Sequence, residues 1–569
     1  MRFLALITDY DGTLAHHGVV ADETVEALQR LRQSGRKLVL VTGREMPDLE
    51  RVFPHLNLFD RIVAENGAVL VNPTTRDTRV LAERPPDEFI AELKARNVTG
   101  LSKGEVIVAT WHPHETVVLE TIRRLGLDLQ VIFNKDAVMV LPAGVNKMTG
   151  LNQALKELKL SRRNIAGVGD AENDLAFLNC CECAVGVANA LPAIKERADL
   201  VTQEDHGAGV VSLISRIIED DLKSVDLPLE KHGILFGRIP DRDIYIGTEG
   251  RVVLLSGPSG SGKSTFVAGL VERIEARDYQ VCVIDPEGDY EKISGFITLG
   301  NEQRPPSFEE ILQVLEEPDS NLVVNLVGAK MQDRPHFFAS LLTKLQEKRL
   351  RDGRPHWIII EEAHHLLPSE WAPTAPQLAA QTASLVFVTV HPEHMSPAAL
   401  RMVNTVAAVG IEPQKVLAEF ASVVHQVPPE LTPGPLSSGE AAVWFLDSNT
   451  MVDRMQSVQG KAERKRHRRK YAEGELEPER VFYFRGPEGK MNLRAQNLLT
   501  FLQLAEGVDD ETWLYHLRRA DYSTWLALAI KDSELAEQIR QVEQDNSLSP
   551  METRREISKA VEAKYTAPA

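Results

Sequence analysis

Two aspartates near the start of the chain, Asp9 and Asp11, stand two apart at the end of an apolar run, in the segment DYDGT. Residues two apart on an extended chain point to the same side, so both carboxylates can flank one metal ion and one phosphoryl group. Four later residues add a hydroxyl, a cation and two more acids in VTGRE, VNKMTG and GVGDAENDLAFL: Thr42, Lys147, Asp170 and Asp174. These residue types predict a site for a divalent cation and a transferring phosphoryl group.

A second phosphate-binding pattern lies near the middle of the chain, in GPSGSGKST, residues 257–265. It matches G-x-x-x-x-G-K-[ST], the loop whose backbone N–H groups and lysine hold nucleotide phosphates. An apolar strand precedes it and a helical pattern follows, as that use of a helix N-terminus requires. The expected nucleotide-binding residues are Gly257, Ser259, Gly260, Gly262, Lys263, Ser264 and Thr265, with Ser264 also on Mg2+.

Two acids close the apolar run in WIIIEEAHHLLP, where a Walker B motif would put a metal-side acid and a catalytic glutamate. Glu361 takes the metal side, and Glu362 can polarise an attacking water. This arrangement favours hydrolysis of a nucleoside triphosphate such as ATP over its transfer to an alcohol.

Strands and helices must position both sets of residues. FLALITD, KLVLVTG and RIVAENGAVLV are each predicted as a strand, and DETVEALQRLRQSG as a helix ending at Gly35. Alternation of this kind predicts a parallel sheet covered by helices. The alternation restarts at Arg251, and the strand ends that carry the polar residues are where open α/β sheets bind ligands.

The predicted fold class is α/β: a Rossmann-like core with an inserted α+β cap, a P-loop NTPase domain, and a small, mostly helical C-terminal domain. The expected ranges are 1–72 and 135–222 for the core, 73–134 for the cap, 230–450 for the P-loop domain, 451–477 for a basic linker and 478–569 for the helical domain.

The first set of motifs, in this order, resembles the haloacid dehalogenase (HAD) superfamily of phosphatases over residues 1–222. The insertion and ENGA resemble the capped branch, subfamily IIB, with Cof-type, sucrose-phosphatase-like and phosphoglycolate-phosphatase-like enzymes. The resemblance implies that Asp9 is the nucleophile and Asp11 the general acid–base. It implies that Asp9, Asp170 and the Asp11 carbonyl hold Mg2+ with support from Asp174, and that Thr42 and Lys147 bind the phosphoryl group. Expected substrate contacts are Gly43, Arg44, Asn66 and Asn173.

The second set, with VIDPEGDY and SGEAAVWF, resembles the HerA/FtsK branch of P-loop ATPases over about 230–450. There are departures from the pattern. Glu361 stands where aspartate is usual, and His391 follows the strand whose end commonly carries a polar sensor such as glutamine. Arg401 is a weak candidate for an arginine finger, which leaves a hexameric motor in doubt.

Composition limits the partners. The net charge of −18 argues against broad nucleic-acid binding, although Lys461 to Lys470 holds seven Lys or Arg. This basic stretch is interpreted first as a solvated segment and second as a contact for an acidic partner. Cys180, Cys181 and Cys183 are expected to be small buried residues, and the histidine pairs AHHG, WHPHE, EEAHHL and HPEH show no clear third metal ligand. No apolar run is long enough for a membrane span, and a cytoplasmic protein is expected.

The region from about Pro478 resembles a small helical family of unknown function. Trp513, His516, Asp521, Tyr522 and Trp525 carry the likeness, and packing is the favoured role for them. We expect an interaction or regulatory module.

The favoured function is hydrolysis of a small phosphorylated metabolite, controlled by ATP binding or hydrolysis. Two alternatives stay open: an ATP-driven nucleic-acid-processing protein with DNA end phosphatase activity, and a bifunctional kinase–phosphatase. Nucleic acid is the less favoured partner, and self-association into a homo-oligomer is left open.

Overall fold

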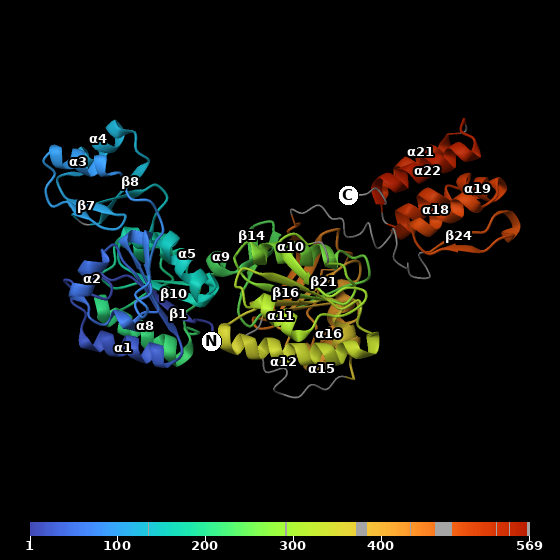
Figure 1. Cartoon of the computed structure of the whole chain (residues 1–569). Helices are drawn as coiled ribbons and strands as arrows, with labels where there is room; N and C mark the ends of the chain where they lie inside the picture. Colours follow the sequence, from blue (N-terminus) through green and yellow to red (C-terminus); the bar gives the residue numbers. More distant parts are fainter. Residues whose placement is uncertain are drawn as a thin grey trace. The chain divides into compact units, whose positions relative to one another are not determined.

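The chain forms two units, Met1–Gly460 and Lys461–Ala569 (Figure 1). The computed structural model describes residues 1–134, 136–290, 293–370, 384–432, 434–460, 481–530, 532–545 and 547–565. The basic stretch 461–470 and most of the expected linker lie outside these residues. Within the described ranges, no helix combines the length and the apolar character needed to cross a bilayer.

The N-terminal part of the first unit is built on an eight-stranded sheet in the order β12-β11-β10-β1-β2-β3-β4-β5. The strands from β12 to β3 run parallel, and β4 and β5 run antiparallel to their neighbours. Their bounds are β1 Ala5–Thr8, β2 Lys37–Val41, β3 Arg61–Ala64, β4 Val69–Val71, β5 Thr78–Val80, β10 Ile165–Gly169, β11 Cys183–Gly186 and β12 Leu200–Val201. The predicted parallel α/β core is confirmed.

Helices cover this sheet, and the longer ones pack through one apolar stripe. In α1, the buried side chains Val25, Leu28 and Leu31 recur at helical spacing, and α1 packs against α8. The predicted helix is confirmed and ends just before Gly35. The bounds are α1 Asp22–Gln33, α2 Met46–Val52, α5 Lys147–Leu158, α6 Leu175–Leu178, α7 Pro192–Lys195 and α8 His206–Asp220.

The segment RIVAENGAVLV, predicted as one strand, is a hairpin. β3 and β4 pair antiparallel on either side of Glu65–Gly67. Asn66 has φ 54° and Gly67 has φ 105°, and a Cβ on Gly67 would lie 1.9 Å from the Asn146 carbonyl oxygen. The continuous apolar pattern hid this turn, which depends on a conformation that glycine and asparagine tolerate.

The cap is a separate sheet in the order β6-β7-β9-β8, with two helices. The bounds are β6 Ser102–Lys103, β7 Val108–Trp111, β8 Leu129–Asn134, β9 Ala137–Pro142, α3 Asp87–Ala95 and α4 Glu115–Leu125. Along β9, Val138 and Val140 pack with the cap helices, while Met139 and Leu141 pack with the core. This alternation buries both faces of the strand.

The expected cap, residues 73–134, does not have the same boundaries as the observed cap sheet at either end. β5 lies inside that range but pairs with β4 in the core sheet, and β9 lies in the expected core but pairs with β7 and β8. Both strands are second arms of hairpins, and their pairing partner decides the sheet they join.

The rest of the first unit is an eleven-stranded sheet in the order β14-β13-β23-β22-β21-β15-β20-β19-β16-β18-β17. Strands from β21 to β17 are parallel, and β22, β23, β13 and β14 are antiparallel to their neighbours. Their bounds are β13 Ile234–Ile239, β14 Arg242–Ile246, β15 Val252–Ser256, β16 Val281–Asp285, β17 Phe296–Leu299, β18 Asn321–Asn325, β19 Trp357–Ile360, β20 Ser384–Thr389, β21 Thr405–Val409, β22 Glu440–Phe445 and β23 Thr450–Ser457.

Two hydrophobic clusters enclose this sheet. Leu254 and Ile358 belong to one cluster, and their neighbours Val253 and Ile359 belong to the other. Burial on both faces explains why these strands are continuous apolar runs. The helices are α9 Leu229–His232, α10 Lys263–Glu275, α11 Phe308–Leu315, α12 Arg334–Asp352, α13 Ala363–Leu366, α15 Pro397–Leu400 and α16 Pro413–Val424. β23 extends the domain past residue 450, into the range expected for the linker.

The second unit combines a short hairpin with helices. The bounds are β24 Phe482–Phe484, β25 Leu493–Ala495, α18 Leu498–Gly507, α19 Asp510–Leu517, α20 Asp521–Trp525, a π-helix Leu526–Ile530, α21 Ser533–Gln544 and α22 Pro550–Tyr565. Trp513 stacks on Tyr522 with ring centroids 4.5 Å apart, and His516 Nδ1 pairs with Asp521 at 2.8 Å. These contacts fit the packing role favoured for the residues.

Candidate active sites

The first candidate site lies where β1 and β10 end side by side. Asp9 follows β1, and its N–H donates to the Val168 carbonyl of β10 at 3.1 Å. Lys147 begins α5 and donates to Asp9 Oδ1 at 2.5 Å and to Asp174 Oδ1 at 2.6 Å. The ammonium group is buried, with 1% of its side chain exposed. The structure therefore brings together the predicted nucleophile, cation and supporting acid.

Asp170 and Asp174 occupy the loop after β10. Asp174 Oδ2 accepts the N–H groups of Asp170 and Ala171 at 2.9 and 3.0 Å, so hydrogen bonds orient both of its oxygens. Thr13 donates its hydroxyl to Asp170 Oδ1 at 3.1 Å. Gly12 has φ 86°, and a Cβ there would lie 2.2 Å from Asp170 Oδ2, so this position needs glycine for conformation and for space.

The charges of this cluster fit a divalent cation. Asp9, Asp170 and Asp174 offer ligand oxygens within 4.8 Å of one another. Burial, Asp174 and Asp170 raise the pKa of Asp9 well above its usual range, against the opposing effect of Lys147. Burial acts to lower the pKa of Lys147, but Asp174 and Asp9 outweigh it and raise that pKa. One ammonium group only partly offsets three carboxyl groups, so the cluster favours a divalent cation, and Mg2+ prefers such oxygen ligands.

The Asp11 carboxylate pairs with an arginine, Arg44, rather than with the lysine of this cluster. Arg44 holds its carboxylate with both Nε and Nη2, at 2.6 and 2.7 Å, and also pairs with Asp48. Hydrogen bonds to Asp11 raise the pKa of the Arg44 guanidinium. The predicted general acid–base and a predicted substrate contact are therefore ion-paired with each other, an arrangement that the sequence spacing did not reveal.

The other expected substrate contacts gather between the core and the cap. Asn173 donates to Asn66 Oδ1 at 3.2 Å, and Asn66 Nδ2 lies 3.5 Å from the sulfur of Met139, a cap residue. Thr42 is buried, and its hydroxyl accepts the Arg44 N–H at 3.1 Å. A Cβ on Gly43 would stand 3.6 Å from Asn66 Oδ1, so Gly43 borders the same space.

Glu65 is a residue whose role the sequence analysis missed. Its buried carboxylate accepts three consecutive N–H groups at the start of the cap strand, from Glu105, Val106 and Ile107, at 2.8 to 2.9 Å. The glutamate in ENGA was visible, but its partners lie about 40 residues away in sequence. Glu65 joins the core hairpin to the cap.

The second candidate site lies at the end of β15. The loop turns through Gly260, with φ 72°, and Gly262, with φ 97°, and α10 begins at Lys263. A Cβ on Gly257 would lie 2.2 Å from the Val409 carbonyl oxygen. Lys263 donates to the carbonyls of Gly257 and Pro258 at 2.8 and 3.0 Å, which holds its ammonium over the loop. Ser264 and Thr265 follow in the first helical turn, and Ser259 lies within the loop.

The predicted Walker B acids follow β19, two strands from β15 in the same sheet. Glu361 is buried and accepts the hydroxyl of Tyr290. Burial raises its pKa well above its usual range, as do Asp285, Glu362 and Asp289, and Lys263 opposes them. Glu362 has φ 44° at the start of α13 and lies 3.5 Å from His364 Nδ1. Lys263, Glu361 and Glu362 thus meet at one end of the sheet.

β20 separates these strands and ends at the buried Thr389. Its hydroxyl accepts the His391 N–H at 3.1 Å and pairs with His364 Nδ1 at 3.0 Å. Burial lowers the pKa of His364 to about 4, and neighbouring histidines and Lys263 act in the same direction. The polar group at this strand end is therefore Thr389, whereas His391 points outward and Arg401 is exposed at the end of α15.

Two protein families match parts of the chain. The family described as haloacid dehalogenase-like hydrolase matches residues 6–109 and 130–214. The family described as the central domain of helicase HerA matches residues 250–354. The first match contains the motifs from Asp9 to Asp174, and the second contains the loop from Gly257 to Thr265 but ends before Glu361 and Glu362.

Known proteins resemble the first of these regions. A phosphoglycolate phosphatase of Haloarcula marismortui is 31% identical over 218 residues, 37% of this chain and 95% of that protein. Phosphoglycolate phosphatase 2 of Saccharolobus solfataricus is 29% identical over 238 residues, 39% of this chain and 97% of that protein. A solved haloacid dehalogenase-like hydrolase from Bacteroides thetaiotaomicron is 19% identical and covers 38% of this chain and 99% of its own, with a TM-score of 0.34.

These two phosphatases are matched over almost their whole length, while the P-loop of the second site lies in a region that a different family matches. The chain belongs to the haloacid dehalogenase-like hydrolases, and it joins that domain to one of the type described as the central domain of helicase HerA.

Proposed function

We propose that this protein is a Mg2+-dependent phosphatase of small phosphate monoesters, controlled by ATP in its P-loop domain. The observation that carries the first half is the buried group of Asp9, Lys147, Asp170 and Asp174. When bound, Mg2+ would be held by Asp9, Asp170 and the Asp11 carbonyl, and would offset the charge of the phosphoryl oxygens.

In the proposed reaction, a carboxylate oxygen of Asp9 attacks the phosphorus while the bond to the ester oxygen breaks. Asp11 gives a proton to that departing oxygen, then takes one from the water that cleaves the aspartyl-phosphate. Lys147 orients Asp9 and neutralises part of its surroundings. Thr42 offers its hydroxyl to the transferring group.

The Arg44–Asp11 pair bears on substrate choice. Arg44 donates to both oxygens of the Asp11 carboxylate, so Asp11 must leave Arg44 before either oxygen can exchange a proton with the substrate. A substrate with its own carboxylate supplies a replacement partner for Arg44. The names of the two similar phosphatases point the same way, and phosphoglycolate is our first candidate substrate.

Control by ATP is proposed from the contacts between the two catalytic domains of the first unit. Buried Glu182 pairs with Arg2 at 2.7 Å and accepts the hydroxyl of Tyr279 at 3.0 Å. His356 Nε2 pairs with Asn164 Oδ1 at 3.1 Å. Asn164 precedes β10 and His356 precedes β19, and Asp170 and Glu361 follow the ends of these two strands. A displacement of β10 or β19 at one site can thus be transmitted along the strand to this contact, and from there to the other site.

The test measures phosphate release with Mg2+ from phosphoglycolate, sugar phosphates and nucleotides, with and without ATP. Wild type is compared with Asp9→Asn and Lys263→Ala. We expect Asp9→Asn to abolish monoester hydrolysis, and Lys263→Ala to keep it while removing the response to ATP. Monoester hydrolysis that survives in Asp9→Asn would refute the phosphatase mechanism.

The match to the helicase HerA central domain favours a second candidate, an ATPase that acts on nucleic acid. Its signature would be DNA-stimulated ATP hydrolysis that weakens steeply with salt. The kinase–phosphatase alternative would be supported if labelled phosphate from ATP appeared on an acceptor other than water. Glu362 argues against this alternative, because it is expected to favour hydrolysis of ATP.

A further inference from the structure

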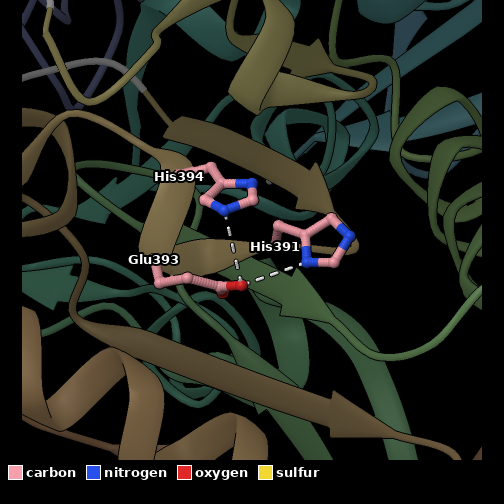
Figure 2. A group of neighbouring side chains, drawn as sticks. All are labelled: His391, Glu393 and His394. Carbon is pink, nitrogen blue, oxygen red and sulfur yellow. Dashed lines mark hydrogen bonds and ion pairs between the residues drawn. The ribbon is translucent and has the colours of Figure 1, made fainter.

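A cluster of two histidines and one glutamate lies just beyond β20, in the segment HPEH (Figure 2). His391 Nδ1 lies 3.1 Å from Glu393 Oε1, and His394 Nε2 lies 3.9 Å from the same oxygen. One ligand atom from each residue lies within 4.8 Å of the others. The third ligand that the sequence pattern lacked is thus Glu393, which the short 3-10 turn Pro392–His394 brings between the two rings.

The distances suit a small divalent ion. Zinc bound at about 2.0–2.1 Å by nitrogen and oxygen ligands separates neighbouring ligand atoms by a little over 3 Å in a tetrahedral site. The Glu393–His391 distance already matches, and the Glu393–His394 distance requires a small side-chain rotation. All three side chains are substantially exposed, at 50%, 37% and 62%, so an ion can reach them from solvent and keep an open position.

The turn that carries the cluster packs against α16. The His391 and His394 rings lie 4.9 Å apart, and imidazole nitrogens are common ligands of transition-metal ions.

We propose that His391, Glu393 and His394 bind a borderline divalent transition-metal ion such as Zn2+. Two imidazoles and one carboxylate suit zinc, cobalt or nickel, whereas Mg2+ prefers oxygen ligands. This site is separate in chemistry from the all-carboxylate cluster of Asp9, Asp170 and Asp174.

A metal ion bound to this cluster would constrain the neighbouring residues of the nucleotide site. The His391 N–H donates to Thr389, which also pairs with His364, and the His391 and His364 rings lie 6.0 Å apart. His364 follows the predicted Walker B acids by two residues. Zinc on His391 therefore fixes one side of the segment that carries Glu361 and Glu362, next to the P-loop.

The experiment counts Zn2+ bound per chain in the full-length protein, by competition with a chromophoric chelator in excess Mg2+. The variants are His391→Ala, Glu393→Gln and His394→Ala. The exposed His336→Ala is the matched control in the same domain, and His16→Ala tests a second histidine group, in which the His16 and His206 rings lie 4.4 Å apart. We expect each cluster variant to weaken one zinc equivalent by roughly 100-fold or more, since losing a group that merely orients a ligand costs about 10–100-fold.

Cobalt provides a second readout, because bound Co2+ gives visible absorption bands that depend on its ligands. These bands should appear in wild type and in His336→Ala and be lost in His391→Ala. Unchanged zinc affinity in all three cluster variants, or loss of the same equivalent in His16→Ala, would overturn the proposal. Glu393 is exposed, so Glu393→Gln tests the site without disturbing the core.

Discussion

At the scale of single residues, the phosphatase site depends on one buried ammonium group. Lys147 contacts both Asp9 and Asp174, and its side chain is almost inaccessible to solvent. Removing one partner from a buried ion pair leaves the other charge without compensation. We therefore expect the same two contacts of the lysine to stabilise the fold and to position the proposed nucleophile, Asp9.

Lys147→Met should abolish monoester hydrolysis and lower the free energy of unfolding by about 3–5 kcal/mol. Phosphate release and urea unfolding measure the two effects. The control is Lys159→Met, because the Lys159–Glu317 pair is exposed and such pairs contribute little to stability. A Lys147→Met protein as stable and active as the control would show that the buried pair has neither role.

At the scale of elements, the strand ends were the part of the site that the sequence could predict. Asp9, Asp170, Lys263 and Glu361 each follow or begin an element whose apolar or helical pattern is local, and the parallel sheets bring those ends together. Contacts across the chain could not be predicted in this way. The pairing of Arg44 with Asp11 and of Glu65 with the cap depends on turns and pairings that no local pattern encodes.

Glu65→Gln tests the link between the hairpin and the cap. A neutral amide accepts the N–H groups of Glu105, Val106 and Ile107 less strongly than a carboxylate, and its NH2 group cannot accept at all. We expect faster hydrogen exchange of these amides, equivalent to a loss of about 1–3 kcal/mol locally. We also expect a higher KM for the monoester, because the cap borders the proposed substrate contacts. Glu88→Gln, at an exposed position in α3, should change neither quantity.

His356, which precedes β19, should make the stability of the protein depend on pH. The ring is buried, its Nδ1 accepts the Gln280 N–H at 2.8 Å, and burial, Arg349 and Arg354 lower its pKa well below 6.5. The unfolded chain binds a proton below about 6.5 while the folded protein does not, so stability from this group is complete above that pH and falls below it. His356→Gln should flatten the loss of stability between about pH 6.5 and 5, as measured by urea unfolding. An unchanged slope would mean that His356 is not a titrating group in this range.

At the scale of the whole molecule, the question is whether the two catalytic domains of the first unit communicate. Their contact is polar and buried: Glu182, 1% exposed, faces Arg2, Arg163 and Tyr279. Arg163 also stacks on Tyr279, 5.2 Å from the ring centroid. Buried polar groups of this kind keep their partners because an unpaired buried charge is costly. We therefore expect a conformational change in one domain to displace the contacting residues of the other.

Tyr279→Phe removes a single hydroxyl from this contact and keeps the ring under Arg163. Glu182 retains its two arginines, so we expect the phosphatase activity without ATP and the ATP affinity to stay near wild type. The response of monoester hydrolysis to ATP should fall at least several-fold, because the hydroxyl is the direct link from the P-loop domain to Glu182. Tyr245→Phe is the matched control, since its hydroxyl lies 3.5 Å from Asp243 within the P-loop domain. If Tyr279→Phe and Tyr245→Phe respond to ATP equally, the signal does not pass through Glu182, and the pairing of Asn164 with His356 becomes the route to test.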